Sequence, residues 1–201
     1  NYHLTLLVKN GTGYFNLLKL VSLGHLEGFY YKPRVDKELL GKYHEGLIAL
    51  SGCLKGEIAV LAGRGEMKRA LQTAEEYRRI FNDRRFYIEI QKNGVEDQLR
   101  VNERLLEIGH QLSLPAVATN DCHYLQRKDA KAHEVLLCIQ TGKTLQDSER
   151  MKFPSDEFYF KSPQEMADLF QSTPEAVFHT TEIAEQCNLE MRFDDRHIPR
   201  I

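Results

Sequence analysis

The sequence predicts an α/β protein in which strands alternate with helices in a mainly parallel layer or barrel. Short apolar runs of strand length recur as far as residue 118, and longer stretches with helical periodicity separate most of them. Parallel strands need crossover connections of this kind, whereas the strands of a sandwich are joined by short turns. About four strands are visible, too few to close a barrel. We therefore expect further strands in sequence that precedes Asn1.

The composition favours a folded protein of the cytoplasm. Hydrophobic residues make up 42% of the 201 residues, enough to bury a core. Charged residues make up 28% and the net charge is −2, which excludes a basic nucleic-acid-binding tail but not a local basic face. No apolar run approaches the roughly 20 residues that cross a bilayer, so no membrane partner is expected. The four widely spaced cysteines, without a secretory signal, predict reduced thiols.

The first part of the chain shows two strands, each followed by helical sequence. In chain order the expected elements are strand 2–8, helix 14–26, helix 37–43, strand 47–51 and helix 66–81. The stretch before the second helix is extended because Pro33 keeps the residue before it out of helical conformations. Asp36 supplies an N-cap for that helix. The run 47–51 is continuously apolar, as the buried strands of parallel sheets are.

The second part continues the alternation and then changes character. The expected elements are strand 86–90, helix 95–112, strand 116–118 and helix 128–141. Beyond Gly142 the sequence is polar and aromatic without helical period. Ser162, Pro163 and Glu165 supply an N-cap, a proline in the first turn and a capping-box glutamate, and Thr173 with Pro174 begins the next helix in the same way. We therefore divide the chain into a domain over 1–142 and a connection over 143–201.

Residues suited to metal binding follow the ends of several strands. Asp121 and His123 come directly after strand 116–118, and residues two apart at a strand end point the same way. Cys53 follows strand 47–51 by two residues, and the carboxyl ends of parallel strands share one edge of a sheet. His3 lies near the start of its strand, so its position is less certain. A thiolate, imidazoles and a carboxylate suit zinc, or a mixed site that also accepts manganese or iron.

Each of these residues also has a structural explanation. Asn-Asp is good turn chemistry, which makes ligand and turn equally plausible for Asp121. Cys53 alone is more often a small core residue, and His3 alone a hydrogen-bonded strand histidine. Glu89, inside strand 86–90, could support a metal ligand or pair with a helix lysine. His133 could orient a ligand or, as we favour, hydrogen-bond a loop carbonyl.

Other motifs are weak or missing. The basic region 66–85 suggests a solvated helix face, with phosphate contact as the sharper alternative, because acidic residues interleave with the basic ones. The sequence has no P-loop and no G-x-S-x-G motif, which argues against a P-loop ATPase and a serine hydrolase.

Several stretches resemble the alpha subunits of bacterial replicative DNA polymerase III. These are 2–10, 13–17, 27–34, 46–53, 118–124 and 137–143, and the likeness runs nearly end to end. The part represented is similar to the N-terminal PHP (polymerase and histidinol phosphatase) domain and the connection towards the polymerase palm.

The resemblance implies a PHP-type distorted (β/α)7 barrel, here incomplete, with a helical C-terminal extension leading towards the palm. In the family a metal cluster lies at the carboxyl ends of the strands. By their place in the motifs, His3, Cys53, Asp121 and His123 look like its later ligands, with zinc or manganese as the expected divalent metal. The family's opening His-x-His motif and the Asp, His and Glu ligands that follow it lie upstream and are absent from this sequence.

The resemblance also implies a function for the parent protein. It would add deoxynucleotides to a DNA primer with two magnesium ions, held by aspartates downstream of Ile201. Expected partners are DNA, deoxynucleotides and other replicase subunits, among them a proofreading exonuclease subunit and the sliding clamp. The PHP domain would be either a metal-dependent phosphoesterase or 3′–5′ exonuclease site, or a catalytically silent scaffold that stabilises the polymerase and binds the proofreading subunit. The extension over 143–201 argues against a stand-alone PHP phosphatase.

Overall fold

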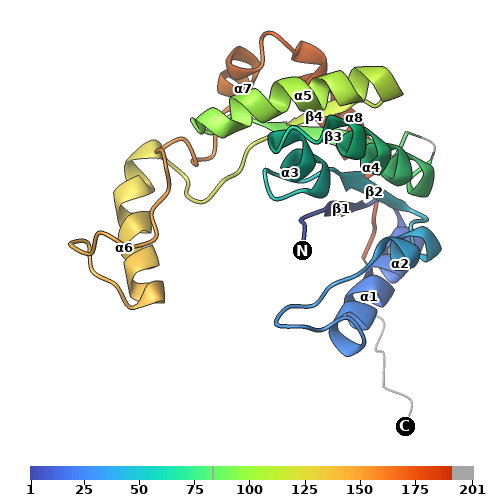
Figure 1. Ribbon diagram of the computed structural model, residues 1–201, viewed down its shortest axis with the longest axis horizontal. Helices are drawn as coiled ribbons and strands as arrows, with labels where there is room; N and C mark the ends of the chain where they lie inside the picture. The colour runs from blue at the N-terminus through green and yellow to red at the C-terminus, as the bar shows by residue number, and fades with distance from the viewer. Residues whose placement is uncertain (83, 192–201) are drawn as a thin grey trace.

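The computed structural model of the protein describes residues 1–82 and 84–191 (Figure 1). Within them the strands β1 (Thr5–Val8), β2 (Leu47–Leu50), β3 (Phe86–Gln91) and β4 (Ala116–Thr119) form one sheet in the order β1-β2-β3-β4. β2, β3 and β4 are parallel, whereas β1 runs antiparallel to β2. The α/β class is therefore confirmed, but the sheet is mixed rather than wholly parallel. The seven-stranded barrel stays a prediction.

The helices agree in position with most of the sequence pattern. They are α1 (Gly11–Leu26), α2 (Lys37–Lys42), α3 (Glu57–Gly63), α4 (Met67–Ile80), α5 (Glu96–Leu112), α6 (Ala130–Thr141), α7 (Pro163–Leu169) and α8 (Pro174–Gln186), with the short 3-10 helix η1 (Arg127–Asp129) before α6. α1 begins three residues before the predicted start at 14, because the Asn10 side chain accepts a hydrogen bond from the Gly13 N–H and caps the helix. The predicted capping box of Ser162 and Glu165 is present at α7.

Alternate residues of the strands pack into two cores. On one face Ala49, Ile88 and Ala118 contribute to a large cluster with residues of α3, α4 and α5. On the other face Tyr87 belongs to a smaller cluster that includes Ile183 of α8. The helices α3, α4 and α5 thus cover one side of the sheet and α8 the other (Figure 1). Burial on both sides explains why β2 is apolar throughout and why the first three residues of β3 are apolar.

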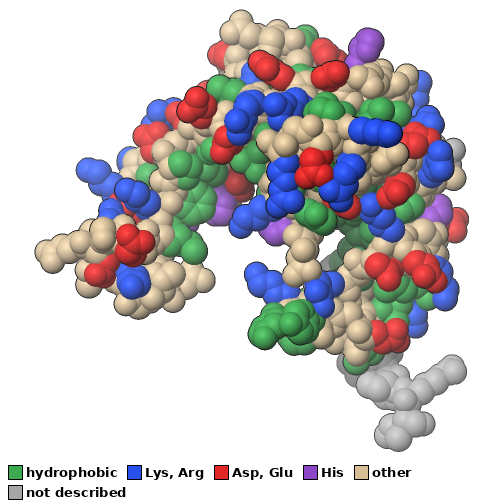
Figure 2. All heavy atoms as spheres, viewed as in Figure 1, with side chains coloured by type: hydrophobic (Ala, Val, Ile, Leu, Met, Phe, Trp, Pro, Cys, Tyr) green, Lys and Arg blue, Asp and Glu red, His purple; other side chains and the backbone are tan. Residues whose placement is uncertain are grey.

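α6 stands apart from this body as an arm (Figure 1). The chain leaves the sheet after β4, forms α6 and returns along the segment 153–161. This returning segment pairs with the loop after β4, because Phe158 accepts a backbone hydrogen bond from His123 (2.8 Å) and Phe160 donates one to Tyr124 (3.0 Å). Figure 2 shows a hollow between the arm and the body, with hydrophobic and histidine side chains on the arm's side of it.

Among the helices of residues 1–82 and 84–191, none is both long enough and apolar enough to cross a membrane.

Candidate metal centre

The reversed direction of β1 brings His3 and Cys53 together. Because β1 is antiparallel to β2, its amino end lies beside the carboxyl end of β2. The loop that follows β2 is attached to the chain before β1, since the His3 N–H donates to the Lys55 carbonyl (3.0 Å). As a result, Sγ of Cys53 lies 3.7 Å from Nδ1 of His3. The expected parallel layer does not extend to β1, whose amino end rather than its carboxyl end lies at this edge.

A glycine makes this close approach possible. Gly52 has φ of +84°, in the region that favours glycine, and a Cβ atom there would lie 2.6 Å from the His3 carbonyl oxygen. The backbone before Cys53 can therefore pass directly against the backbone of His3. Any side chain at residue 52 would push the two predicted ligands apart.

The spacing of His3 and Cys53 fits a shared metal ion. Zinc binds sulfur at ~2.3 Å and imidazole nitrogen at ~2.0–2.1 Å, so two such ligands in a tetrahedral site lie roughly 3.5–3.6 Å apart. The observed 3.7 Å between the sulfur and the nitrogen is close to this value. The pair supplies the soft and borderline donors that zinc favours.

Asp121 and His123 form a second pair, at the end of β4. Oδ1 of Asp121 lies 3.0 Å from Nε2 of His123, and both side chains are partly exposed. The rings of Phe153 and His133 contact the His123 ring, with centroid distances of 4.5 Å and 5.7 Å. The two predicted ligands therefore do face one spot, and aromatic packing restricts the imidazole of His123.

His133 belongs to this aromatic group. Its ring also lies 4.9 Å from that of Phe153 and 5.4 Å from that of Tyr124. Burial, and then the nearby His123, lower the pKa of His133. Within the described part of the chain no loop carbonyl accepts a hydrogen bond from His133. Its ring contacts therefore favour the other alternative, in which it orients the His123 ring.

The two pairs are not joined into one cluster. Among residues 1–82 and 84–191, no set of three or more His, Cys, Asp or Glu side chains is close enough to hold a metal ion. Each pair supplies two of the three or four protein ligands that a zinc site needs. The assignment of His3, Cys53, Asp121 and His123 as ligands of one cluster stays a prediction.

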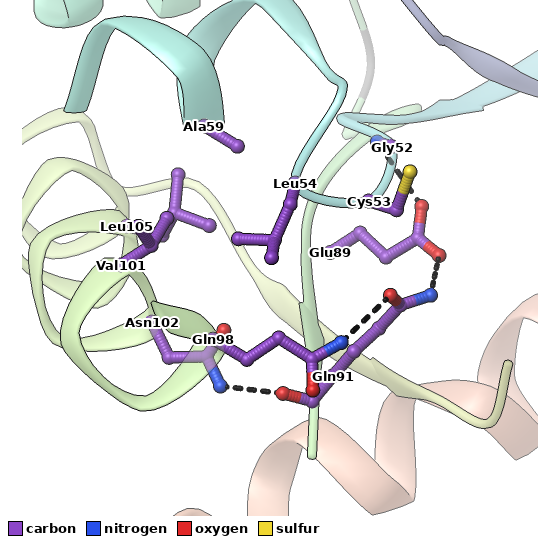
Figure 3. Close-up of a pocket in the computed structure, with 10 residues that line it drawn as sticks. All are labelled: Gly52, Cys53, Leu54, Ala59, Glu89, Gln91, Gln98, Val101, Asn102 and Leu105. Atoms are coloured by element: carbon purple, nitrogen blue, oxygen red, sulfur yellow. Dashed lines mark hydrogen bonds between the residues drawn. The ribbon is translucent and has the colours of Figure 1, made fainter. Parts of the chain in front are cut away.

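Glu89 lies between the two pairs in a buried hydrogen-bond network. It is 6% exposed, and its carboxylate accepts hydrogen bonds from Thr5, Gly52, Gln91 and Thr119. Figure 3 shows the carboxylate reaching the Gly52 N–H beside Cys53. The partners of Glu89 are thus hydroxyl and amide groups, and not the helix lysine of one of its two predicted roles.

The sequence pattern gave no role to the donors of this network. Thr5 stands two residues after His3, and Thr119 stands two residues before Asp121. Alternation along a strand would have placed each threonine on the same side as its predicted ligand. The aromatic residues that pack on His123 were also missed, because Phe153 and Phe158 lie in sequence assigned to the connection. No local signal identifies that long-range contact.

The sequence of the chain is similar to the sequences of known proteins. Residues 1–93 match the PHP domain family. The chain is 45% identical over 190 residues to the DNA polymerase III subunit alpha of Treponema pallidum (strain Nichols), an alignment that covers 94% of this chain and 16% of the relative. It is 47% identical over 206 residues to the same subunit of Thermus aquaticus, covering 100% of this chain and 17% of the relative.

A third relative, the DNA polymerase III subunit alpha of Borreliella burgdorferi, is 47% identical over 189 residues, covering 94% of this chain and 16% of the relative. The chain spans about a sixth of the length of the curated relatives that it matches. The proposed division at residue 142 remains a prediction. Over nearly its whole length the chain is thus similar to DNA polymerase III alpha subunits, and its residues 1–93 match the PHP domain family.

Proposed function

We propose that the intact protein is the alpha subunit of a bacterial replicative DNA polymerase and that this chain supplies its PHP domain. The support is the identity of 45–47% to DNA polymerase III alpha subunits over nearly the whole chain. Template-directed synthesis, with its two magnesium ions, would take place in another part of the protein. Its partners would be DNA, deoxynucleotides, a proofreading subunit and the sliding clamp. It would act in the cytoplasm.

Within this chain we propose a divalent-metal site for phosphoester hydrolysis. The observation that carries it is the 3.7 Å approach of Cys53 Sγ to His3 Nδ1, which fits two ligands of one zinc ion. Asp121 and His123 would supply the other ligands of this chain. A bound zinc or manganese ion would lower the pKa of a bound water for attack on phosphorus.

The residues of the chain would hold the ligands in place. The loop before Cys53 is fixed by the Gly52 N–H, and the loop that carries His123 is fixed by the Phe158 carbonyl. The aromatic rings around His123 would keep its imidazole from rotating away from Asp121. Both pairs would therefore be preorganised before a metal binds.

The second candidate is a silent PHP scaffold that stabilises the polymerase and binds a proofreading exonuclease subunit. The observation that favours it is the arrangement of the predicted ligands in two pairs, with no group of three or more in the described residues. Two separate pairs would contribute contacts that stabilise the domain, but they would not bind the metal ion that hydrolysis needs.

A nuclease assay on the intact protein separates the two. With manganese or zinc present, release of nucleotides from a 3′-labelled single strand is compared for wild type and Asp121→Ala/His123→Ala. Asp97→Ala/His110→Ala, an exposed carboxylate and imidazole on α5, is the matched control. The metal-site proposal expects metal-dependent release that the first variant loses and the control keeps, while primer extension continues in both. Absence of metal-dependent release from the wild type would favour the scaffold.

A further inference from the structure

Glu89 is a buried carboxylate whose partners in the described part of the chain are all uncharged. Oε1 accepts from the Thr119 hydroxyl (2.6 Å) and the Gln91 amide (3.3 Å). Oε2 accepts from the Gly52 N–H (3.1 Å) and the Thr5 hydroxyl (3.5 Å). A carboxylate only accepts hydrogen bonds and has about four lone-pair positions. The four donors around it match that capacity.

Three of these donors belong to the segments that carry the predicted ligands. Thr5 lies on the strand that His3 precedes, Gly52 directly precedes Cys53, and Thr119 ends the strand that leads to Asp121. These segments come from β1, from the loop after β2 and from β4, so no local sequence contact holds them in register. Glu89, at the centre of β3, joins all three through one carboxylate.

The position of Glu89 is itself fixed. Its backbone N–H donates to the Ser51 hydroxyl (2.8 Å), and its strand pairs with β2 on one side and β4 on the other. The carboxylate therefore emerges from a strand that is buried along its whole length and paired on both sides. A group that donates a hydrogen bond to this carboxylate therefore has its position fixed relative to the whole sheet, and not only relative to its own loop.

A chain of buried amides extends the network to the backbone of Asp121. Gln91, which donates to Glu89, accepts from Gln98 (3.5 Å), and Gln98 accepts from the Asn93 N–H (2.7 Å). The Asn93 side chain then donates to the Asp121 carbonyl (3.5 Å). Figure 3 shows the part of this chain that lines a cavity of about 10 Å³ beside Cys53.

We propose that Glu89 is a positioning residue that sets the relative placement of the His3, Cys53 and Asp121 segments. The proposal rests on the proposed metal site for its effect on metal binding, but its geometric part does not. The ability of both carboxylate oxygens to accept hydrogen bonds is the important property, because Glu89→Gln keeps the shape of the side chain and turns one acceptor into a donor that faces another donor. The loops would then separate from β3 while the hydrophobic core stays packed.

The first test measures the position of the Cys53 loop without any metal. In the intact protein, alkylation of Cys53 by iodoacetamide is followed by peptide mass spectrometry relative to Cys187, a half-buried cysteine at the end of α8. Glu89→Gln is expected to raise the Cys53-to-Cys187 rate ratio several-fold. An unchanged ratio would overturn the proposal.

Arg85 provides the matched control. It is also buried (7% exposed) and its guanidinium hydrogen-bonds the carbonyls of His44 and Leu47 at the opposite ends of the strands. Arg85→Met loses a buried, hydrogen-bonded charge of the same sheet but none of the contacts at the ligand segments. It is expected to lower stability without changing the alkylation ratio. A rise in both variants would show general loosening and would contradict a specific role for Glu89.

The second test measures zinc binding by competition with a chelator. Residues that orient metal ligands change affinity by roughly 10–100-fold when they are replaced. Glu89→Gln is expected to weaken binding of zinc in this range, and Arg85→Met to leave it unchanged. If the wild type binds no zinc, the proposed metal site fails, while the alkylation ratio still decides the role of Glu89.

Thr119 keeps the proposal testable if Glu89→Gln does not fold. Thr119→Val removes the hydroxyl that donates to Glu89 and keeps the volume, whereas Thr119→Ser keeps the hydroxyl. The valine variant is expected to weaken zinc binding and the serine variant to restore it. Equal affinity in the two variants would contradict the proposal.

Discussion

Nδ1 of His3 lies 3.7 Å from Sγ of Cys53, although 50 residues separate them in the sequence. The contact exists because β1 runs antiparallel to β2, so that the residues before β1 meet the residues after β2. A parallel β1 would have placed His3 at the opposite edge of the sheet. The direction of this one strand therefore decides whether His3 can share a metal ion with Cys53.

Replacing Cys53 by serine should affect zinc more than manganese. Thiolate is the ligand that selects zinc, whereas oxygen ligands suit manganese. We expect zinc affinity to fall about tenfold or more, which is about 1.4 kcal/mol, with a smaller change for manganese. Chelator competition with each metal measures both values. Cys187→Ser, at the end of α8, is the control, and equal losses for the two metals would contradict a thiolate ligand.

Gly52→Ala should destabilise the fold. The new Cβ would lie 2.6 Å from the His3 carbonyl oxygen, and the backbone at φ of +84° disfavours any residue with a Cβ. We expect a loss of about 2 kcal/mol in the free energy of unfolding, measured with denaturant.

Gly41→Ala is the matched control for that substitution. Gly41 lies in α2, and a Cβ there would meet no atom within 4 Å. Alanine favours the helix, so a gain of about 0.5–1 kcal/mol is expected. Equal effects of the two substitutions would show that the contact between Gly52 and His3 is not close in solution.

Much of the fold follows from the sequence because its signals are local. The apolar runs of β2 and β3, the Asp36 cap and the Ser162–Glu165 capping box each depend on residues close together in the chain, and all are present. The strand direction of β1 depends on pairing across the sheet, which no pattern within residues 2–8 reveals.

In the candidate site, too, the local contacts were predictable from the sequence and the long-range contacts were not. Alternation after β4 correctly paired Asp121 with His123, whose side chains meet at 3.0 Å. The donors to Glu89 and the aromatic contacts of Phe153 come from segments far apart in the sequence. Such contacts form only when the whole sheet is assembled, so periodicity could not have identified them.

Glu165 should titrate far below an ordinary glutamate. Hydrogen bonds from the Tyr159 hydroxyl, then from the Ser162 backbone and hydroxyl, lower its pKa to about 2 from 4.5. A carboxyl whose pKa is lower in the folded state stabilises that state above pH 4.5, and the contribution is lost as the pH falls from 4.5 to about 2.

An NMR titration that follows the side-chain carboxyl carbon of Glu165 tests this expectation. Tyr159→Phe removes the shortest of these hydrogen bonds, at 2.6 Å, and should raise the midpoint towards the ordinary value. A wild-type midpoint near 4.5 would show that the capping box and the tyrosine contact do not persist in solution.

The most direct test of the metal site is the metal content of the intact protein. Wild type and Asp121→Ala/His123→Ala are purified with zinc and manganese present, dialysed and analysed for bound metal, with Asp97→Ala/His110→Ala as the control. We predict that the wild type and the control retain divalent metal and that the Asp121→Ala/His123→Ala variant retains markedly less. Equal metal content in all three proteins would contradict the assignment of Asp121 and His123 as ligands.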